Sequence, residues 1–298
     1  MGLQVTHVNK CYGKKTVVDD LSFTIERPGA FGFLGTNGAG KTTTIRMILG
    51  ILAKDSGSIA WNGKQVKREN VNFGYLPEER GIYPKTKVAE QLLYFARLRG
   101  MEKAAAKVSM DYWCRRLEVD QYLRQPAEQL SKGNQQKVQF VSALIQNPEL
   151  LVLDEPFSGL DPVNTELLKS VIEELVQKGT YIIMSSHQMA SIEEFCSDLL
   201  ILDGGKTILA GTLAEIKRGY GLSNLSVRSR ADLSPYVAAS GLKVLARFPD
   251  GYDLKPETED GARALLSALV QAGVPVDRFE LKAPSLNEIF LEKVGAAR

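Results

Sequence analysis

The sequence of 298 residues has little cysteine, no long apolar run and no marked excess of charge of either sign. Its three cysteines, Cys11, Cys114 and Cys196, lie far apart and form no CxxC pair, which argues against a disulfide framework and a zinc site. A reduced, cytoplasmic setting fits them best. No apolar run reaches the roughly 18–20 residues that a membrane-spanning helix needs. Any role at a membrane is therefore expected to come through a partner.

The charge of the chain is nearly balanced, because 37 Lys and Arg residues face 35 Asp and Glu residues. Proteins that bind nucleic acid usually carry a basic excess or stripe, so nucleic acid is not an expected partner. Lys64, Lys67 and Arg68 form a small basic group, which fits a solvated face. The hydrophobic fraction of 44% is sufficient for a full core.

Apolar stretches and amphipathic stretches alternate along much of the chain, which is typical of a largely parallel sheet with helices on both faces. Helical spacing dominates residues 87–123. A break containing Gly, Tyr and Ser at residues 218–225 predicts a linker. The remainder has the pattern of a small α+β domain without a catalytic constellation. Strands are predicted at residues 3–8, 21–26, 30–34, 58–61, 64–66, 150–153, 181–185 and 199–202, and helices at 43–49, 166–177 and 192–196.

A glycine-rich loop follows the apolar stretch 30–34. Residues 35–42, GTNGAGKT, match G-x-x-x-x-G-K-[ST] at every fixed position. Glycine permits backbone angles that let amide groups wrap around phosphate, and the helix that follows presents its positive end to the anion. Lys41 is expected to reach the β- and γ-phosphates of ATP, Thr42 to ligate Mg²⁺ and Thr43 to bond the α-phosphate. The strand–loop–helix context disfavours an ordinary glycine-rich turn.

The predicted nucleotide contacts of this loop are Gly35, Thr36, Asn37, Gly38, Ala39, Gly40, Lys41, Thr42 and Thr43.

Two adjacent carboxylates end a second apolar stretch, where Asp154 and Glu155 follow residues 150–153. An apolar strand delivers such side chains to the carboxyl edge of a parallel sheet, where α/β folds bind ligands. Asp154 is predicted to hold Mg²⁺ through water, since Mg²⁺ retains part of its hydration shell. Glu155 is predicted to act as general base on the attacking water. Alone, the pair fits two acids ending a strand in solvent equally well.

Residues 130–137, LSKGNQQK, resemble the LSGGQ signature of ATP-binding-cassette (ABC) ATPases. The other motifs of that family follow in matching order over residues 3–213. The resemblance identifies residues 35–43 as the Walker A loop and residues 158–161, including Asp161, as the D-loop. It implies that Asp154 and Glu155 are the Walker B aspartate and the catalytic glutamate.

The resemblance further implies that Tyr12 stacks on adenine, that Glu78 occupies the Q-loop position as a metal ligand, and that His187 is the catalytic switch histidine. Taken alone, Tyr12 also fits a half-buried aromatic and His187 a structural histidine. Ser131 and the amides around Gly133 open a helix, whose N-terminus is expected to face the γ-phosphate of a second subunit.

Two positions depart from the family pattern. Lys132 replaces a glycine of the signature, and Glu78 replaces the usual glutamine. A carboxylate still serves Mg²⁺ as a hard oxygen ligand, but it adds negative charge beside the phosphates. A shift of one residue, which would place Glu79 at the Q-loop position, is the alternative.

The fold implied is the P-loop ABC ATPase fold: a mainly parallel sheet, an antiparallel β subdomain and an inserted helical subdomain. The ATP-binding domain is expected at residues 1–218, with the helical subdomain at about 85–135. A linker at 219–225 and a small α+β accessory domain at 226–298 complete the prediction.

The expected function is that of an ATP-hydrolysing subunit of an ABC transporter, which pairs with a second nucleotide-binding subunit around MgATP. Permease subunits would hold it at the inner face of the cell membrane. Their candidate contacts are Ile82, Tyr83, Pro84 and residues 124–129, for which local packing is the alternative. The single cassette with an α+β tail is similar to bacterial ABC-2-type exporters, which favours export. The alternatives are a regulatory or mechanical ABC ATPase and a module that closes without turnover.

Overall fold

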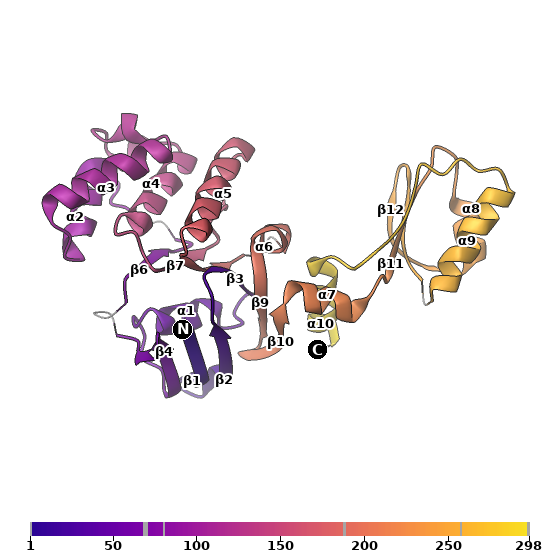
Figure 1. The fold of residues 1–298 in the computed structure, drawn as a ribbon, viewed down its shortest axis with the longest axis horizontal. Coiled ribbons are helices and arrows are strands. Elements are labelled where there is room, and N and C mark those ends of the chain that lie inside the picture. Colours follow the sequence, from indigo (N-terminus) through magenta and orange to yellow (C-terminus); the bar gives the residue numbers. More distant parts are fainter. Residues whose placement is uncertain (1, 68–70, 80, 187–188, 257, 297–298) are drawn as a thin grey trace. The chain divides into compact units, whose positions relative to one another are not determined.

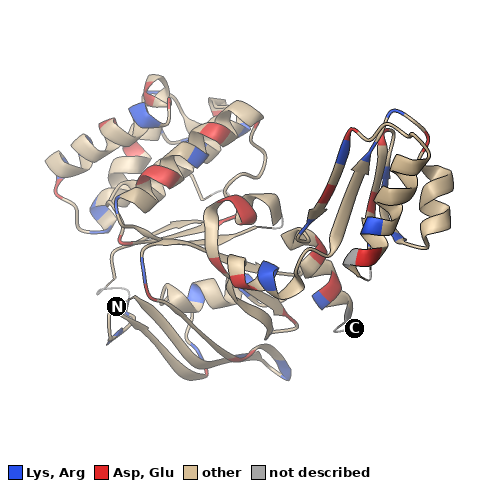
Figure 2. Ribbon diagram, turned by 45° about the vertical axis from the view of Figure 1, so that its right-hand side comes forward, with Lys and Arg blue, Asp and Glu red and all other residues tan. Residues whose placement is uncertain are grey.

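The computed structural model describes residues 2–67, 71–79, 81–186, 189–256 and 258–296. The chain divides into two compact units, Met1–Gly211 and Thr212–Arg298 (Figure 1). Among the helices within these described ranges, none is long and apolar enough to cross a membrane. Lysine and arginine are interspersed with aspartate and glutamate along the elements of both units (Figure 2), in keeping with the balanced charge.

A six-stranded sheet forms the centre of the first unit, and its strands follow the order β10-β9-β3-β8-β7-β6. Parallel pairing joins β9 to β3, β3 to β8, β8 to β7 and β7 to β6, so the prediction of a mainly parallel sheet is confirmed. All five residues of β7 are buried, because other elements of the fold cover both faces of this central strand. The strands are β3 (Gly29–Gly35), β6 (Phe73–Leu76), β7 (Leu150–Asp154), β8 (Tyr181–Ser185), β9 (Cys196–Asp203) and β10 (Lys206–Thr212).

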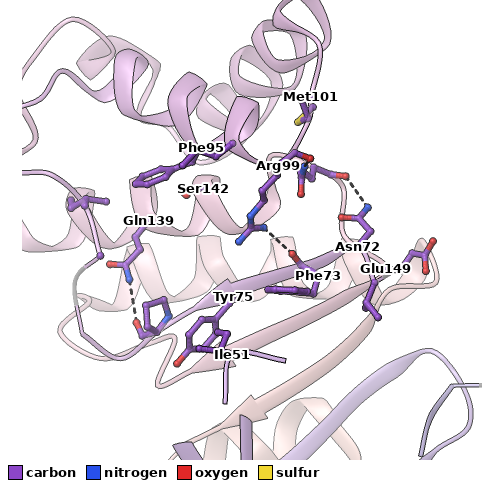
Figure 3. A pocket seen from close by; sticks show the side chains of 16 residues that line it. Ile51, Asn72, Phe73, Tyr75, Phe95, Arg99, Met101, Gln139, Ser142 and Glu149 are labelled. Atoms are coloured by element: carbon purple, nitrogen blue, oxygen red, sulfur yellow. Dashed lines mark hydrogen bonds between the residues drawn. The ribbon is translucent and has the colours of Figure 1, made fainter. Parts of the chain in front are cut away.

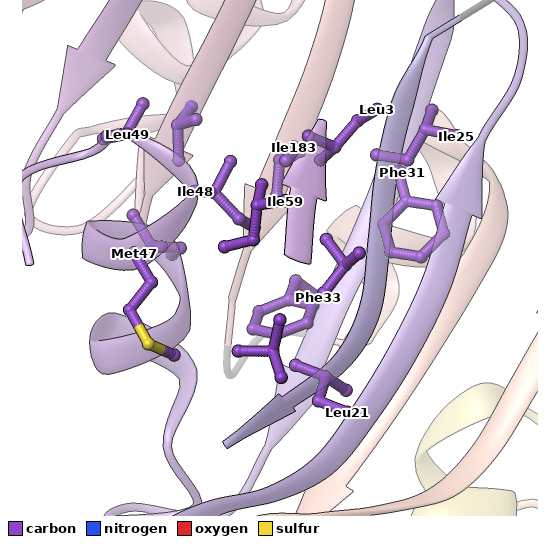
Figure 4. Close-up of a cluster of buried hydrophobic side chains, with 14 of the residues drawn as sticks. Leu3, Leu21, Ile25, Phe31, Phe33, Met47, Ile48, Leu49, Ile59 and Ile183 are labelled. Carbon is purple, nitrogen blue, oxygen red and sulfur yellow. The ribbon is translucent and has the colours of Figure 1, made fainter. Parts of the chain in front are cut away.

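An antiparallel sheet in the order β2-β1-β4-β5 and helix α1 (Lys41–Ile48) pack together with one face of the parallel sheet. Figure 4 shows this core, in which Ile48 of α1 lies among Leu3, Ile59 and Phe33. The first half of the second strand was not predicted, because its residues are mostly polar and exposed. The strands are β1 (Leu3–Tyr12), β2 (Lys15–Ile25), β4 (Ser56–Trp61) and β5 (Lys64–Gln65).

The helical stretch predicted at 87–123 contains two helices, which are separated at Gly100, a residue with a left-handed φ of 86°. The first of them buries Val88, Leu92 and Ala96, which recur at i, i+4 and i+8 on one face. Helix α4 packs on β6. The helices of the first unit beyond α1 are α2 (Val88–Leu98), α3 (Lys103–Arg116), α4 (Lys132–Leu144), α5 (Pro162–Gln177) and α6 (Met189–Phe195), with 3₁₀ turns at Asp120–Tyr122 and Ala127–Gln129.

The second unit is α+β. Its antiparallel sheet has the order β12-β13-β11-β14, and Leu225 and Leu254 of the sheet pack with Leu265 in a separate core. The linker predicted at 219–225 overlaps the end of the helix that opens this unit. The elements are α7 (Leu213–Tyr220), β11 (Asn224–Arg228), α8 (Ser234–Ser240), β12 (Lys243–Phe248), β13 (Gly251–Lys255), α9 (Glu259–Gln271), β14 (Arg278–Lys282) and α10 (Leu286–Ala296).

Candidate functional site

The glycine-rich loop connects the buried strand β3 to helix α1. Gly40 caps the helix with a left-handed φ of 102°, and a Cβ there would lie 2.5 Å from the carbonyl oxygen of Val17. Asn37 and Gly38 form the exposed tip of the loop, while Thr42 and Thr43 are partly exposed in the first turn of α1. The loop thus offers backbone amides and a helix N-terminus to an anion.

Lys41 folds back over its own loop. Its Nζ donates to the carbonyl oxygens of Gly35 at 2.7 Å and of Thr36 at 3.2 Å. Burial lowers the pKa of the Lys41 ammonium, and the charges of Glu155, Asp154 and Glu78 oppose that shift. The ammonium therefore lies in the field of the three carboxylates that the sequence singled out.

A contact that the sequence did not predict supports the loop from the side. The Thr36 hydroxyl donates to Oδ1 of Asp203 at 2.7 Å. Asp203 ends β9, and Gly35 pairs with Leu202 in the parallel register of β3 and β9. A second hydrogen bond comes from the turn that follows β9, where the Gly205 amide donates to the Ala39 carbonyl at 3.2 Å.

Asp154 and Glu155 stand at the carboxyl end of β7. Asp154 is 3% exposed and accepts a hydrogen bond from the hydroxyl of Ser185 in β8. Burial raises the pKa of the Asp154 carboxyl, which the Ser185 hydrogen bond partly offsets. Glu155 leaves the strand with a left-handed φ of 52°, a conformation that non-glycine residues rarely adopt and that tends to occur at functional sites. Its Oε2 accepts from the Ser186 hydroxyl at 3.2 Å.

Glu78 lies at the same edge of the sheet. It follows β6, which runs parallel to β7 with Leu76 opposite Leu153. The side chain is exposed, and its charge raises the pKa of the Asp154 carboxyl. Asp154, Glu78 and the Thr42 hydroxyl supply the hard oxygen atoms that Mg²⁺ prefers, and the buried, negatively charged position of Asp154 suits a cation. The residues present thus fit a magnesium ion.

The residues of the signature and the D-loop cap neighbouring helices. Ser131 is the N-cap of α4, and its Oγ accepts from the Asn134 amide at 3.3 Å. Asp161 is the N-cap of α5 and accepts from the Asn164 amide at 2.9 Å. A Cβ on Gly133 would lie 3.7 Å from the side chain of Asn164, so the two helix starts adjoin. Both cap residues are exposed.

Two predicted residues remain, Tyr12 and His187. Tyr12 ends β1 with its side chain 52% exposed, and the Lys10 ammonium lies 5.7 Å from the centre of its ring. His187 lies outside the described residues, so its role stays a prediction.

An open groove of about 1260 Å³ borders the loop that carries Glu78, where Pro77 and Gly81 line it (Figure 3). Phe95 and Leu98 of α2, Tyr75 of β6 and Gln139 of α4 contribute to its walls. Of the predicted permease contacts, Ile82 lines the groove. The segment 124–129 instead packs locally, with the Gln125 carbonyl accepting from Val88 and the Glu128 amide donating to Pro84. Tyr83 stacks on Phe95 at 5.8 Å and remains 51% exposed.

Comparison with known families matches residues 18–158 to the ABC transporter family and residues 211–294 to the C-terminal domain of DrrA1-3-like ATP-binding proteins. The first match covers the glycine-rich loop, the signature and the acid pair, and the second covers most of the smaller unit.

Two curated relatives extend the likeness over nearly the whole chain, and one solved structure extends it over most of the chain. An uncharacterized ABC transporter ATP-binding protein of Bacillus subtilis, YhaQ, is 48% identical over 99% of both chains. The Nod factor export ATP-binding protein I of Ralstonia nicotianae is 34% identical over 98% of this chain and 94% of its own. The solved structure of an ATP-binding subunit of an ABC transporter is 31% identical, covers 80% of this chain and 99% of its own, and superposes with a TM-score of 0.69.

Proposed function

Because the chain belongs to the family of ABC transporter ATP-binding proteins, which hydrolyse ATP to drive transport, we propose that it works as one half of a dimer that closes on MgATP and powers export through separate membrane subunits. The observation that carries this proposal is the convergence of Lys41, Asp154 and Glu155 at one edge of the parallel sheet. The loop of residues 35–43 faces the same edge.

Each residue of that edge has one task in the proposed reaction. Lys41 exchanges the carbonyls of Gly35 and Thr36 for the β- and γ-phosphates, and neutralises the charge that develops on them. Glu155 accepts a proton from the attacking water. Asp154, Thr42 and Glu78 hold Mg²⁺, which when bound neutralises phosphate charge and orients the phosphates.

Dimer closure is supported by the exposed helix starts of α4 and α5. One chain holds a single P-loop and a single signature, so a second copy or a related chain must supply Ser131 to each phosphate. In this chain Ser131 and Asp161 cap their own helices and face outward. The positive end of α4 is then available to a γ-phosphate from the partner.

Permease docking is supported by the groove beside Glu78. It is lined largely by apolar side chains, among which Leu98 is 66% exposed. Exposed apolar surface of this kind is typical of interaction sites. We assign it to an amphipathic helix of a membrane subunit. Leu98→Arg is expected to abolish co-purification with that subunit, whereas Val108→Arg, at a 71% exposed position on α3 outside the groove, leaves it intact.

Export is supported by two comparisons. The relative from Ralstonia nicotianae is named for export, and the C-terminal residues match the domain of DrrA1-3-like proteins. The single cassette with its α+β tail agrees with this direction.

The test of the ATPase proposal is steady-state hydrolysis by the purified chain. Glu155→Gln is expected to lower the rate by about 10²- to 10⁴-fold, the usual contribution of a general base, and to trap a dimer with MgATP in light-scattering measurements. Glu149→Gln is the matched control, because Glu149 precedes the same strand at its opposite end and is exposed. Equal rates for Glu155→Gln and the unaltered protein contradict the proposal.

A further inference from the structure

Gln139 connects helix α4 to the loop that carries Glu78 (Figure 3). The residue is 4% exposed, and its Nε2 donates to the carbonyl oxygen of Pro77 at 3.2 Å and of Glu79 at 3.0 Å. These two carbonyls flank Glu78 on either side. One amide group therefore holds the backbone of the loop both before and after Glu78.

The side-chain oxygen of Gln139 shows that this orientation of the amide costs free energy of folding. The Oε1 of Gln139 is buried without a hydrogen-bond partner among the residues that the structure describes. Leaving a buried acceptor unpaired costs about 1–3 kcal/mol. The orientation of the amide follows from the two carbonyls, which accept hydrogen bonds and so require the NH₂ group to face them. We attribute the unpaired oxygen to the two hydrogen bonds that the NH₂ group of the same side chain donates to the loop of Glu78.

The Glu78 side chain depends on that hold. Within the described part of the chain, its carboxylate has no hydrogen-bond partner, and it is exposed. It acts on Asp154 and Lys41 through its charge. Where the carboxylate can reach therefore depends on where the backbone places residue 78, and Gln139 binds that backbone on both sides.

We propose that Gln139 is a positioning residue of the ATP site, which holds the backbone of Glu78 so that its carboxylate could serve Mg²⁺ and act on Lys41. This inference rests on the proposed function of the site. Gln139 also lines the groove and belongs to the helix that Ser131 caps. One side chain thus lies between the groove, the signature helix and Glu78.

The test measures ATP binding without turnover, by titration calorimetry on the Glu155→Gln protein over a series of Mg²⁺ concentrations. Gln139→Met keeps the volume and removes both donors. It is expected to raise the Mg²⁺ concentration for half-maximal ATP binding about tenfold, the effect of roughly one hydrogen bond, with little change in ATP affinity at saturating Mg²⁺. In a Glu78→Ala background the same substitution is expected to have no further effect.

Gln146→Met is the matched control. Gln146 lines the same groove and donates to a carbonyl, that of Arg99 at 2.9 Å, which lies outside the loop of Glu78. The Mg²⁺ dependence of ATP binding by the Gln146→Met variant is expected to equal that of the Glu155→Gln parent. If Gln139→Met does not fold, a second variant is Gln139→Asn, which keeps the amide group and shortens the side chain by one methylene. It is expected to shift the Mg²⁺ dependence of ATP binding in the same direction.

Two results overturn the inference: an unchanged Mg²⁺ dependence in the Gln139 variant, or an equal loss with and without Glu78. The second result would assign Gln139 a purely structural role. Failure of the proposed function is distinguishable, because the Glu155→Gln parent would then bind no ATP at any Mg²⁺ concentration.

Discussion

Replacing Asp154 by Asn is expected to stabilise the ATP-free protein while removing its response to MgATP. Asp154 is 3% exposed, and burial raises the pKa of its carboxyl above the usual range. At neutral pH the ionised carboxylate is therefore less stable in the folded protein than in the unfolded chain. A neutral amide of the same shape removes this penalty, and its Oδ1 still accepts the Ser185 hydroxyl.

The size of the effect follows from the class of substitution. Relieving an active-site group of this kind commonly adds about 0.5–2 kcal/mol, and each kcal/mol corresponds to roughly 2–4 °C in Tm for a unit of this length. Thermal unfolding in EDTA without nucleotide measures it. Added MgATP is expected to raise the Tm of the unaltered protein and not that of the variant. Asp161→Asn is the control, because hydrogen bonds from Asn164 lower the pKa of that exposed carboxyl and no gain is expected.

The pH dependence gives an independent check of sign. The raised pKa means that the unaltered protein gains stability as the pH falls through that pKa, because the buried carboxyl then becomes neutral. The advantage of Asp154→Asn is therefore expected to shrink on acidification. A variant that is less stable than the unaltered protein at neutral pH in EDTA would refute the reasoning. The attraction of the Asp154 carboxylate to Lys41 and Arg46 would then exceed the cost of burying its charge.

Three further outcomes are expected. Asp203→Ala removes the acceptor of the 2.7 Å bond from Thr36 and is expected to weaken ATP binding about tenfold in calorimetry, with unchanged thermal stability of the second unit. Gly40→Ala places a Cβ 2.5 Å from the Val17 carbonyl and is expected to abolish ATP binding and lower the Tm by several degrees. Glu174→Gln is expected to lower the free energy of unfolding by about 2 kcal/mol at neutral pH, because hydrogen bonds from Lys178, Tyr112 and Arg116 hold the pKa of Glu174 at about 2. In urea unfolding, the difference between the variant and the unaltered protein is expected above pH 4.5 and disappears as the pH falls toward 2.

Local patterns predicted most elements of the fold. The alternation of apolar and amphipathic stretches predicted the parallel sheet, and most of the strands predicted in the first unit lie within a few residues of their expected bounds. Strands β6 and β10 and helix α7 were not predicted. The first half of β2 was missed, because its exposed polar residues carry no periodic signal. Helix α5 begins four residues before its predicted start, at Pro162, where Asp161 caps it.

The candidate site was likewise predicted only in part from the sequence. The loop 35–43 and the pair Asp154 and Glu155 are contiguous in the sequence, so their chemistry is readable from residue types and spacing. Their assignment as ATP and Mg²⁺ ligands remains a proposal. Ser185 and Asp203 were not singled out, because isolated serine and aspartate residues have many other uses and only strand pairing brings them to the site.

The sequence by itself determined the family, the phosphate-binding loop and the acid pair. The loop and the acid pair each lie within one turn or strand end, and the family follows from the order of such short motifs along the chain. Tertiary structure alone decided what holds these parts in place. Asp203 reaches Thr36 across 167 residues, and Gln139 reaches Pro77 across 62, through contacts created by the pairing of β9 with β3 and the packing of α4 on β6. Such contacts depend on which distant elements lie side by side, and no local periodicity specifies that.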